Sequence, residues 1–420
     1  MSTGDGEFAR GWPVLAAAFL GIAVGVSSLY FYSLGIFIKP MAAELGWSRG
    51  QASLGALVGT AGAALAAIPV GRLVDRFGGR NVGLVSLTLL ALGFLAVGTW
   101  TAGLTSFLLL TFLVSLTTAG SSPIAFTRLV VTAFHRYRGL ALGIVLAGTG
   151  MGAILVPALL TPYVAEHGWR SGFRALALVV VIAIPLVALL FARCADERRT
   201  TPADEIALRE LSREPAFGLL VGTFLVAAIA VLGTVVQFVP MLSDWGLTPQ
   251  AAGGTAALIG VAAIAGRLIA GLLIDRFPAY AVTMLLFVCA AVGLLVLAGG
   301  GLRFAGAGAV VTGLAIGAEV DLIAFLVARH FPPRAYGKAY GAIYMAFLVG
   351  GAIGPALSGY LRDQTGGYQA SLITASVLLC VAAAIASRLR TVAPWTPLTD
   401  EVQAEHGSHQ SASGPARPAA

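Results

Sequence analysis

Long apolar runs recur along the whole chain, and they constrain its fold more than any other feature. Each run holds about 20 residues, enough for a helix to cross the ~30 Å hydrocarbon core of a bilayer. We therefore predict an all-α polytopic membrane protein with twelve transmembrane helices. The predicted helices lie near residues 12–38, 51–72, 82–101, 105–131, 139–163, 172–192, 216–241, 250–273, 279–299, 304–329, 336–361 and 369–388.

The composition agrees with a lipid environment and excludes several classes of protein. Hydrophobic residues make up 58% of the chain and charged residues only 11%, whereas a soluble protein carries about 25% charged residues. No basic run with interleaved aromatic residues suggests nucleic-acid binding, and no phosphate-binding loop suggests ATP. The cysteines and histidines lack the spacing of metal ligands. We expect no cofactor and no metal.

The widest polar break divides the chain into two parts. We predict an N-terminal six-helix half, a cytoplasmic linker loop, a C-terminal six-helix half and a disordered cytoplasmic tail, at 1–192, 193–215, 216–390 and 391–420. A short surface helix is expected in the linker, starting at Thr201-Pro202 with acidic residues in its first turn. With both termini in the cytoplasm, most loop arginines also fall on that side, as the positive-inside rule requires. This orientation suits a multi-pass protein of the cytoplasmic (inner) membrane.

The two predicted halves share an internal repeat. The segment GRLVDRF at 71–77 returns as GLLIDRF at 271–277, and Pro-Met at 40–41 returns at 240–241. Matches in the same register relate 139–143 to 337–341 and 157–159 to 355–357. Parallel repeats of this kind are typical of secondary transporters that work by alternating access.

The repeated loop resembles a known signature. The segment 71–80, GRLVDRFGGR, resembles the loop between helices 2 and 3 of the major facilitator superfamily. Its carboxylate can accept hydrogen bonds from arginine or from a helix N-terminus across the interface between the halves. We assign a conformational role to this motif and its repeat, with Gly71, Asp75, Arg76, Gly78, Arg80, Asp275 and Arg276 as its residues.

Within that superfamily, the chain most resembles monocarboxylate transporters and oxalate:formate antiporters. Asp5-Gly6 with Gly11-Trp12 resembles an interrupted form of the monocarboxylate family's leader, and 30–37 with Lys39 resembles its first helix. Arg267 stands where that family places its carboxylate-binding arginine, so the resemblance implies a small organic anion as substrate. Two positions depart from the family: Tyr32 replaces its proton-carrying lysine, and Ala263 replaces the acid one turn before the arginine.

Four charged residues lie within predicted helices, where each costs about 2.5–3.5 kcal/mol near the bilayer centre. Arg267 either binds the substrate carboxylate or is held permanently by an acid of a neighbouring helix. Glu319 and Asp321 point about 200° apart on helix 10, so one can pair with Arg267 while the other faces elsewhere. Our hypothesis is that one of them exchanges a proton and thereby frees Arg267. A fixed ion pair and cation binding are the alternatives.

The remaining candidates carry weaker signals. Arg128, nearer the cytoplasmic surface, is expected to extend towards water with a structural or gating role, and Lys338 is expected at the same interface. Five further side chains can either contact substrate or only pack: Tyr30, Tyr32, Gln237, Tyr340 and Tyr344.

These observations predict a secondary active transporter of a small organic anion and not an enzyme. Proton-coupled monocarboxylate symport is the preferred mechanism. Organic anion exchange of the oxalate:formate type and proton-coupled drug efflux are the alternatives. A membrane enzyme or sensor would need a catalytic cluster or a soluble signalling domain, which the sequence lacks. The expected partners are the anion, protons and the lipid bilayer, and we expect a monomer.

Overall fold

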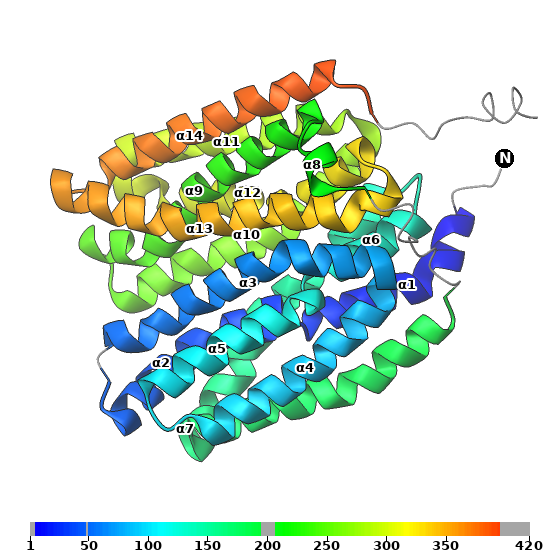
Figure 1. Ribbon diagram of the computed structural model, residues 1–420. Helices are drawn as coiled ribbons and strands as arrows, with labels where there is room; N and C mark the ends of the chain where they lie inside the picture. Colours follow the sequence, from blue (N-terminus) through cyan, green and yellow to red (C-terminus); the bar gives the residue numbers. More distant parts are fainter. Residues whose placement is uncertain (1–4, 48, 195–205, 395–420) are drawn as a thin grey trace, which may run out of the picture.

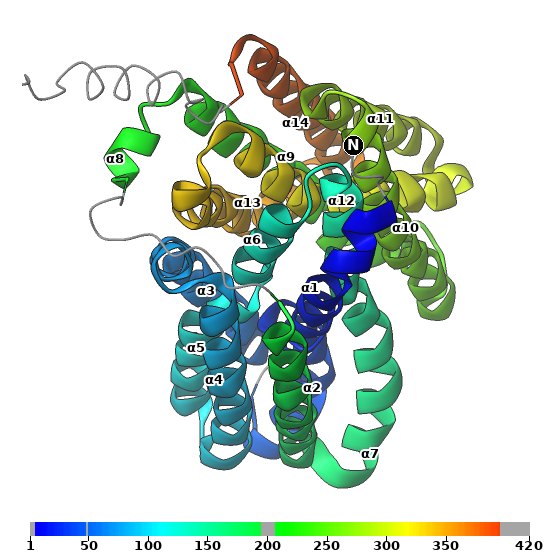
Figure 2. The ribbon, with the colours of Figure 1, turned by 90° about the vertical axis from the view of Figure 1, so that its right-hand side faces the viewer.

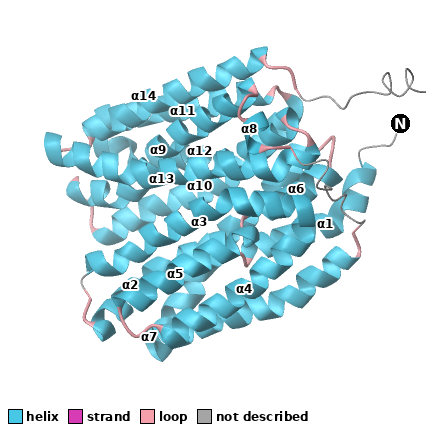
Figure 3. Cartoon of the chain, viewed as in Figure 1, coloured by secondary structure: helices cyan, strands magenta, loops and turns pink. Residues whose placement is uncertain are grey.

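The fold is entirely helical in the part of the chain that the structure describes. A computed structural model describes residues 5–47, 49–194 and 206–394, and Figure 3 shows these residues as helices joined by short loops, with no strand. Ten segments are long and apolar enough to cross a membrane. Two of them, with 55 and 52 residues, would be roughly 80 Å long if straight, more than twice the bilayer core. Each therefore makes two crossings, which gives the twelve predicted.

The helices form two bundles that lie one above the other in Figure 1. The lower bundle contains α1 (Asp5–Ala23), η1 (Val26–Tyr30), α2 (Phe31–Leu45), α3 (Arg49–Phe77), α4 (Gly79–Trp100), α5 (Leu104–Thr118), η2 (Ala119–Ser121), α6 (Pro123–Ala133) and α7 (Arg138–Ala192). The upper bundle contains α9 (Pro215–Asp244), α10 (Pro249–Arg276), α11 (Ala279–Gly300), η4 (Gly301–Phe304), α12 (Ala305–His330), η5 (Pro333–Ala335), α13 (Tyr336–Thr365), α14 (Gln369–Ser387) and η6 (Arg388–Thr391).

The predicted helix positions are confirmed to within a few residues at most ends. The predicted helices 139–163 and 172–192 are joined in α7, which doubles back on itself in Figure 2. The turn lies at Gly168, where φ is 79°. Positive φ is the region that favours glycine, so this residue makes the turn. The predicted surface-helix start at Thr201-Pro202 and the tail from 395 lie outside the described residues; a single helical turn, α8 (Leu208–Leu211), follows in the linker.

Two helices predicted to be continuous are broken. Helix 1 begins earlier than predicted, at Asp5, and passes through the π-helical turn η1 after the extended Gly25. Helix 4 breaks at Ser122 before Pro123, because the residue before proline disfavours helical backbone. The two breaks touch: the freed N–H of Val26 donates to Ser121 Oγ at 3.1 Å. Periodicity of hydrophobic residues cannot reveal such breaks.

The start of α1 and the end of α14 lie at the same end of the molecule, on the right of Figure 1. We call it the termini end and the opposite one the far end. The bundles meet where α3 packs on α13 and α7 packs on α10. The close contacts of these pairs involve the termini-end portions of the helices: Gly71 lies against Gly337, and Gly139 against Gly271. The structure is therefore closed at the termini end.

At the far end, a cluster that we call the Glu44 staple joins elements of the lower bundle. Glu44, in the last turn of α2, forms an ion pair with Arg170 and accepts a hydrogen bond from Trp169 Nε1 at 2.7 Å. The Arg170 guanidinium also donates to the carbonyl of Thr101 at 3.1 Å. The end of helix 1 is thereby fixed to the turn within α7 and to the end of α4.

The upper bundle has a counterpart, the Asp244 staple, two hundred positions later in the sequence. Asp244, at the end of α9, accepts hydrogen bonds from Arg362 Nη2 at 3.0 Å and from the Tyr368 hydroxyl at 3.1 Å. The end of α9 is thereby fixed to the turn between α13 and α14. Each staple stays within one bundle.

Candidate substrate and gating sites

An ion pair joins α10 to α12 inside the upper bundle. Arg267 Nη1 lies 2.9 Å from Asp321 Oδ1, with side-chain exposures of 11% and 0%. The two helices approach closely because of Gly317, where a Cβ atom would lie 2.1 Å from the Ala263 carbonyl oxygen. Removing one partner of such a buried pair costs about 3–5 kcal/mol, because a charge is left uncompensated.

The pair is incompletely satisfied, which leaves it able to react to a ligand. Asp321 Oδ2 is buried without a hydrogen-bond partner among the described residues. Arg267 keeps some exposure while Asp321 has none, so the guanidinium and not the carboxylate is the accessible group of the pair.

Glu319 does not join this pair. Its side chain is fully buried, and neither carboxylate oxygen has a hydrogen-bond partner in the part of the chain that is described. An isolated ionised carboxylate is very costly to bury, so this environment accommodates the neutral acid. Of the two predicted acids, only Asp321 is placed against Arg267.

Three of the five further candidates lie within electrostatic range of Arg267. The charge of Arg267 acts on the hydroxyl groups of Tyr32, Tyr340 and Tyr344. Tyr340 and Tyr344 lie on one face of α13, with ring centroids 5.7 Å apart. Tyr32 of α2 is 37% exposed, so the lower bundle also contributes a polar group here.

The structure does not bring Tyr30 or Gln237 to this group. Tyr30 is buried inside the lower bundle, with its ring 6.2 Å from that of Phe94. Gln237 lies between α9 and α13, where its amide reaches the Pro355 carbonyl at 3.5 Å. Tyr30 thus makes packing contacts, and Gln237 makes a hydrogen bond within the upper bundle. A substrate role for either residue stays a prediction.

The signature loop forms an inter-bundle contact that we call the Asp75 latch. Asp75 accepts hydrogen bonds from the backbone N–H groups of Gly337 at 2.8 Å and Lys338 at 2.9 Å, at the start of α13. An acid at a helix N-terminus satisfies unpaired N–H groups and complements the helix dipole. The same carboxylate lies 2.7 Å from Arg128 Nη1.

One expectation about basic residues is therefore wrong, the extension of Arg128 to water, while its structural or gating role stays a prediction. Arg128 is 2% exposed and does not extend to water, because Asp75 and the Val74 carbonyl bind it inside the bundle. Lys338 is also buried, and its ammonium group donates to the Ile206 carbonyl at 2.7 Å. Charge and depth alone suggested an interfacial position for both, whereas the partners became visible only in three dimensions.

The sequence repeat produces a second contact, the Asp275 latch. Asp275 accepts hydrogen bonds from the N–H groups of Gly139 at 2.6 Å and Leu140 at 2.9 Å, at the start of α7. One glycine and three arginines complete the motif and its repeat. Gly78 makes the turn before α4 with φ 84°. Arg76 and Arg276 are exposed, and Arg80 is half-buried. Each bundle thus supplies one acid to a helix start of the other.

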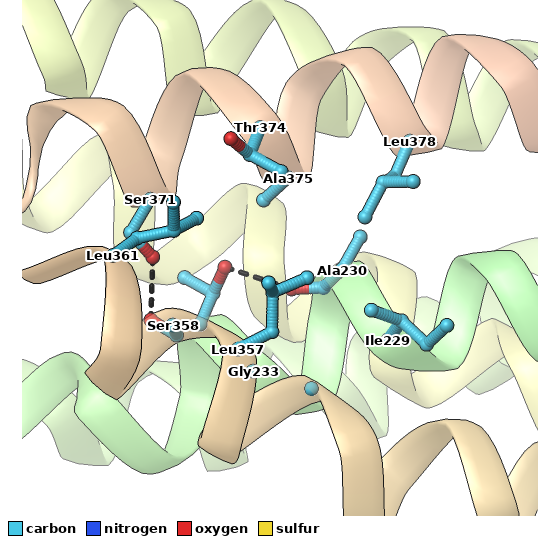
Figure 4. Close-up of a pocket in the computed structure, with 12 residues that line it drawn as sticks. Ile229, Ala230, Gly233, Leu357, Ser358, Leu361, Ser371, Thr374, Ala375 and Leu378 are labelled. Carbon is cyan, nitrogen blue, oxygen red and sulfur yellow. Dashed lines mark hydrogen bonds between the residues drawn. The ribbon is translucent and has the colours of Figure 1, made fainter.

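The pocket in Figure 4 lies away from these groups, between α9, α13 and α14. Its free volume is about 10 Å³, which is the space of one water molecule. The Ser358 and Ser371 hydroxyl groups hydrogen-bond across it. It cannot hold an organic anion, and we give it a packing role.

Comparison with known proteins decides the family. The model of the Major Facilitator Superfamily matches residues 20–318 and 238–414. The chain belongs to the major facilitator superfamily. It is a secondary transporter and not an enzyme.

The similar proteins indicate the branch. Human Monocarboxylate transporter 11 is 30% identical over 403 residues, covering 88% of this chain and 80% of that protein. Monocarboxylate transporter 13 of Bos taurus is 28% identical over 389 residues, covering 88% of this chain and 87% of that protein.

Among solved structures, the transporter FucP in an outward conformation superposes with TM-score 0.74 at 16% identity, covering 91% of this chain and 99% of FucP. The human organic anion transporter MFSD10 gives 0.70, also at 16%, covering 90% and 99%. The resemblance to the monocarboxylate transporter branch is confirmed.

Proposed function

We propose that this protein is a proton-coupled symporter of a small monocarboxylate. The observation that carries the proposal is the Arg267–Asp321 pair, in which a partly exposed guanidinium is bound by a fully buried acid. The similar monocarboxylate transporters support an organic acid as the substrate class.

Coupling follows from competition for one guanidinium. While Asp321 is ionised, it neutralises Arg267 and weakens the attraction for an incoming anion. A proton on Asp321 removes that competition, and the substrate carboxylate then binds Arg267 through paired, charge-assisted hydrogen bonds. The site has no net charge before or after loading. The transporter can therefore change between its outward-facing and inward-facing states, with or without substrate, without moving net charge through the membrane potential.

We further propose that the termini end faces the cytoplasm of a cell with a cytoplasmic (inner) membrane. The segments 1–192 and 216–390 then move as the two halves, linked by 193–215. The structure, closed at the termini end, corresponds to an outward-facing state held by the Asp75 and Asp275 latches. The inward-facing state requires both latches to break.

The test is uptake of a panel of labelled organic acids into proteoliposomes under an imposed proton gradient. Wild-type protein should accumulate at least one monocarboxylate with the gradient as the only driving force. Arg267→Ala should abolish uptake, whereas Arg334→Ala, which removes an exposed arginine, should retain it. Retained uptake in Arg267→Ala would exclude the arginine as the carboxylate ligand.

Asp321→Asn tests the coupling. Asparagine cannot ionise, so Arg267 stays free, and we expect anion exchange to continue while accumulation driven by the proton gradient is lost. Glu319→Gln serves as the comparison, because Glu319 does not touch Arg267. Normal gradient-driven accumulation in Asp321→Asn would contradict the mechanism, and loss of coupling only in Glu319→Gln would transfer the proton to that acid. A wild-type protein that needs internal anion for uptake would be an exchanger.

A further inference from the structure

The turn between α6 and α7 has an unusual set of hydrogen bonds. The backbone N–H groups of three consecutive residues all donate to the carboxylate of Glu7, which lies in the first turn of α1. The distances are 2.6 Å from His135 and 3.3 Å from Arg136 to Oε1, and 3.2 Å from Tyr137 to Oε2. One carboxylate thus fixes three successive peptide groups that belong to no helix.

Aromatic contacts hold the same segments together. The ring of Phe8 lies 5.3 Å from that of Phe134 and 5.7 Å from that of Tyr137. Gly11 lies directly against the Phe134 ring, where a Cβ atom would come within 2.4 Å. Residues 7–11 therefore form a strap, which we call the N-terminal strap, across the turn at 134–137.

The strapped turn leads directly into a latch. After Tyr137 the chain enters α7, whose Gly139 and Leu140 N–H groups donate to Asp275 of the other bundle. Arg138, between Tyr137 and Gly139, donates to the Phe134 carbonyl at 3.0 Å. The start of α7 is thus enclosed by one acid of its own bundle and one of the opposite bundle.

The matching turn of the upper bundle, between α12 and α13, is built with prolines. There, Phe331 is followed by Pro332 and Pro333, which lead through the turn η5 into α13. Proline has no N–H group and fixes its own φ angle, so this turn needs no carboxylate to satisfy donors or to set its shape. The difference explains why an acid is required before α7 when the turn before α13 is built without one.

We infer that Glu7 is a positioning residue for the inter-bundle closure. It holds the 134–137 turn in the shape that presents the N–H groups of Gly139 and Leu140 to Asp275. Because Glu7 and the turn belong to the same bundle, their bonds persist when the bundles separate. The start of α7 is then ready to bind Asp275 again on each return to the closed state.

The experiment measures the closed-to-open ratio by pulsed electron paramagnetic resonance on protein in lipid nanodiscs. Spin labels are placed on Phe77→Cys and Phe277→Cys, two exposed positions at the termini ends of α3 and α10. The native cysteines Cys194, Cys289 and Cys380 are replaced by serine. The distance between the labels reports closure without any substrate, so the result does not depend on the proposed transport function.

Glu7→Gln removes the charge and one acceptor oxygen with little change in size. We expect the closed-to-open ratio to fall at least about threefold, because a turn that Glu7 no longer holds must lose conformational freedom each time it binds Asp275. Glu210→Gln, the same change at an exposed carboxylate, should leave the ratio unchanged. If Glu7→Gln does not insert stably, Phe8→Leu weakens the strap through its ring contacts and should act in the same way.

A double-mutant comparison separates positioning from general stabilisation. In an Asp275→Asn background, Glu7→Gln should change the ratio little further, because the latch that it serves is already broken. In an Asp75→Asn background, Glu7→Gln should show its full effect. Equal effects in both backgrounds, or no shift in the wild-type background, would overturn the inference.

Discussion

Gly337→Ala should open the termini end, because the Asp75 latch has no room for a methyl group. A Cβ atom at Gly337 would lie 2.3 Å from the Gly71 carbonyl oxygen and 2.9 Å from Asp75 Oδ1. Ordinary contact needs about 3.4 Å or more, so α13 must move away from α3 by about 1 Å. That movement lengthens the 2.8 Å bond from Gly337 N to about 3.8 Å, beyond hydrogen-bonding distance.

The size of the effect follows from the bonds lost. Hydrogen bonds to a charged group contribute about 1.5–3 kcal/mol each, and both latch bonds depend on the same approach of the helices. The smaller total, about 3 kcal/mol, corresponds to a change of about a hundredfold in the closed-to-open ratio. Helix propensity does not contribute, because the residue is helical in both states.

Spin-label distances between Phe77→Cys and Phe277→Cys measure this ratio. Gly222→Ala is the matched control: it is also a helical glycine, but the nearest atom to an added Cβ is 3.7 Å away, on Ile385. The control should keep the wild-type distances, while Gly337→Ala shifts them to the open population. Identical distributions for the two variants would refute the close approach of α3 and α13 as the contact that closes this end.

Three further predictions concern single side chains. Arg267→Lys keeps the charge but loses the planar fork, so KM for the anion should rise at least about tenfold in uptake assays with unchanged insertion. Glu319→Gln should leave Tm within about 2 °C of wild type in a fluorescence melting assay, because the amide resembles the neutral acid; a large loss would indicate an ionised Glu319. Asp244→Asn should lower stability only slightly, since the ion pair of its staple is exposed to solvent, and added salt should reduce the difference from wild type.

The sequence predicted the fold well because its two strongest signals were periodic. Apolar runs of membrane length located the helices, and the repeat of 71–77 at 271–277 indicated two halves in the same orientation. The break at Gly25 escaped because its stabilising contact, Val26 to Ser121, joins residues far apart in the chain. The break at Ser122 had a sequence signal in the following Pro123, which a prediction from apolar runs alone does not use.

The candidate site was predicted less completely. The free-energy cost of placing a charge within the membrane identified Arg267, Glu319 and Asp321 as candidates for a functional role. It could not choose between the acids, since that choice depends on the close packing at Gly317. Tyr30 is a candidate because of its residue type. The positions of residues along the sequence do not show that its side chain lies inside the lower bundle.

Glu7 was missed entirely, although a signal was present. The resemblance to the family leader places an acid ahead of Gly11-Trp12, and our interpretation assigns that acid to Asp5-Gly6. A carboxylate that serves three peptide groups of a distant turn has no spacing rule, so only the hydrogen bonds identify it.

The two staples make each bundle a stiff lever. If a bundle pivots near mid-membrane, about 15 Å from its end, a tilt of about 10° displaces that end by roughly 2.6 Å. The four N–H groups that the latch acids bind lie at 2.6–2.9 Å, so this one small tilt breaks all four bonds together. A flexible bundle could lose them one at a time, whereas a stapled one opens in a single step. Contacts at the far end that hold helix ends together within each bundle thus favour opening of the buried gate at the other end in a single step.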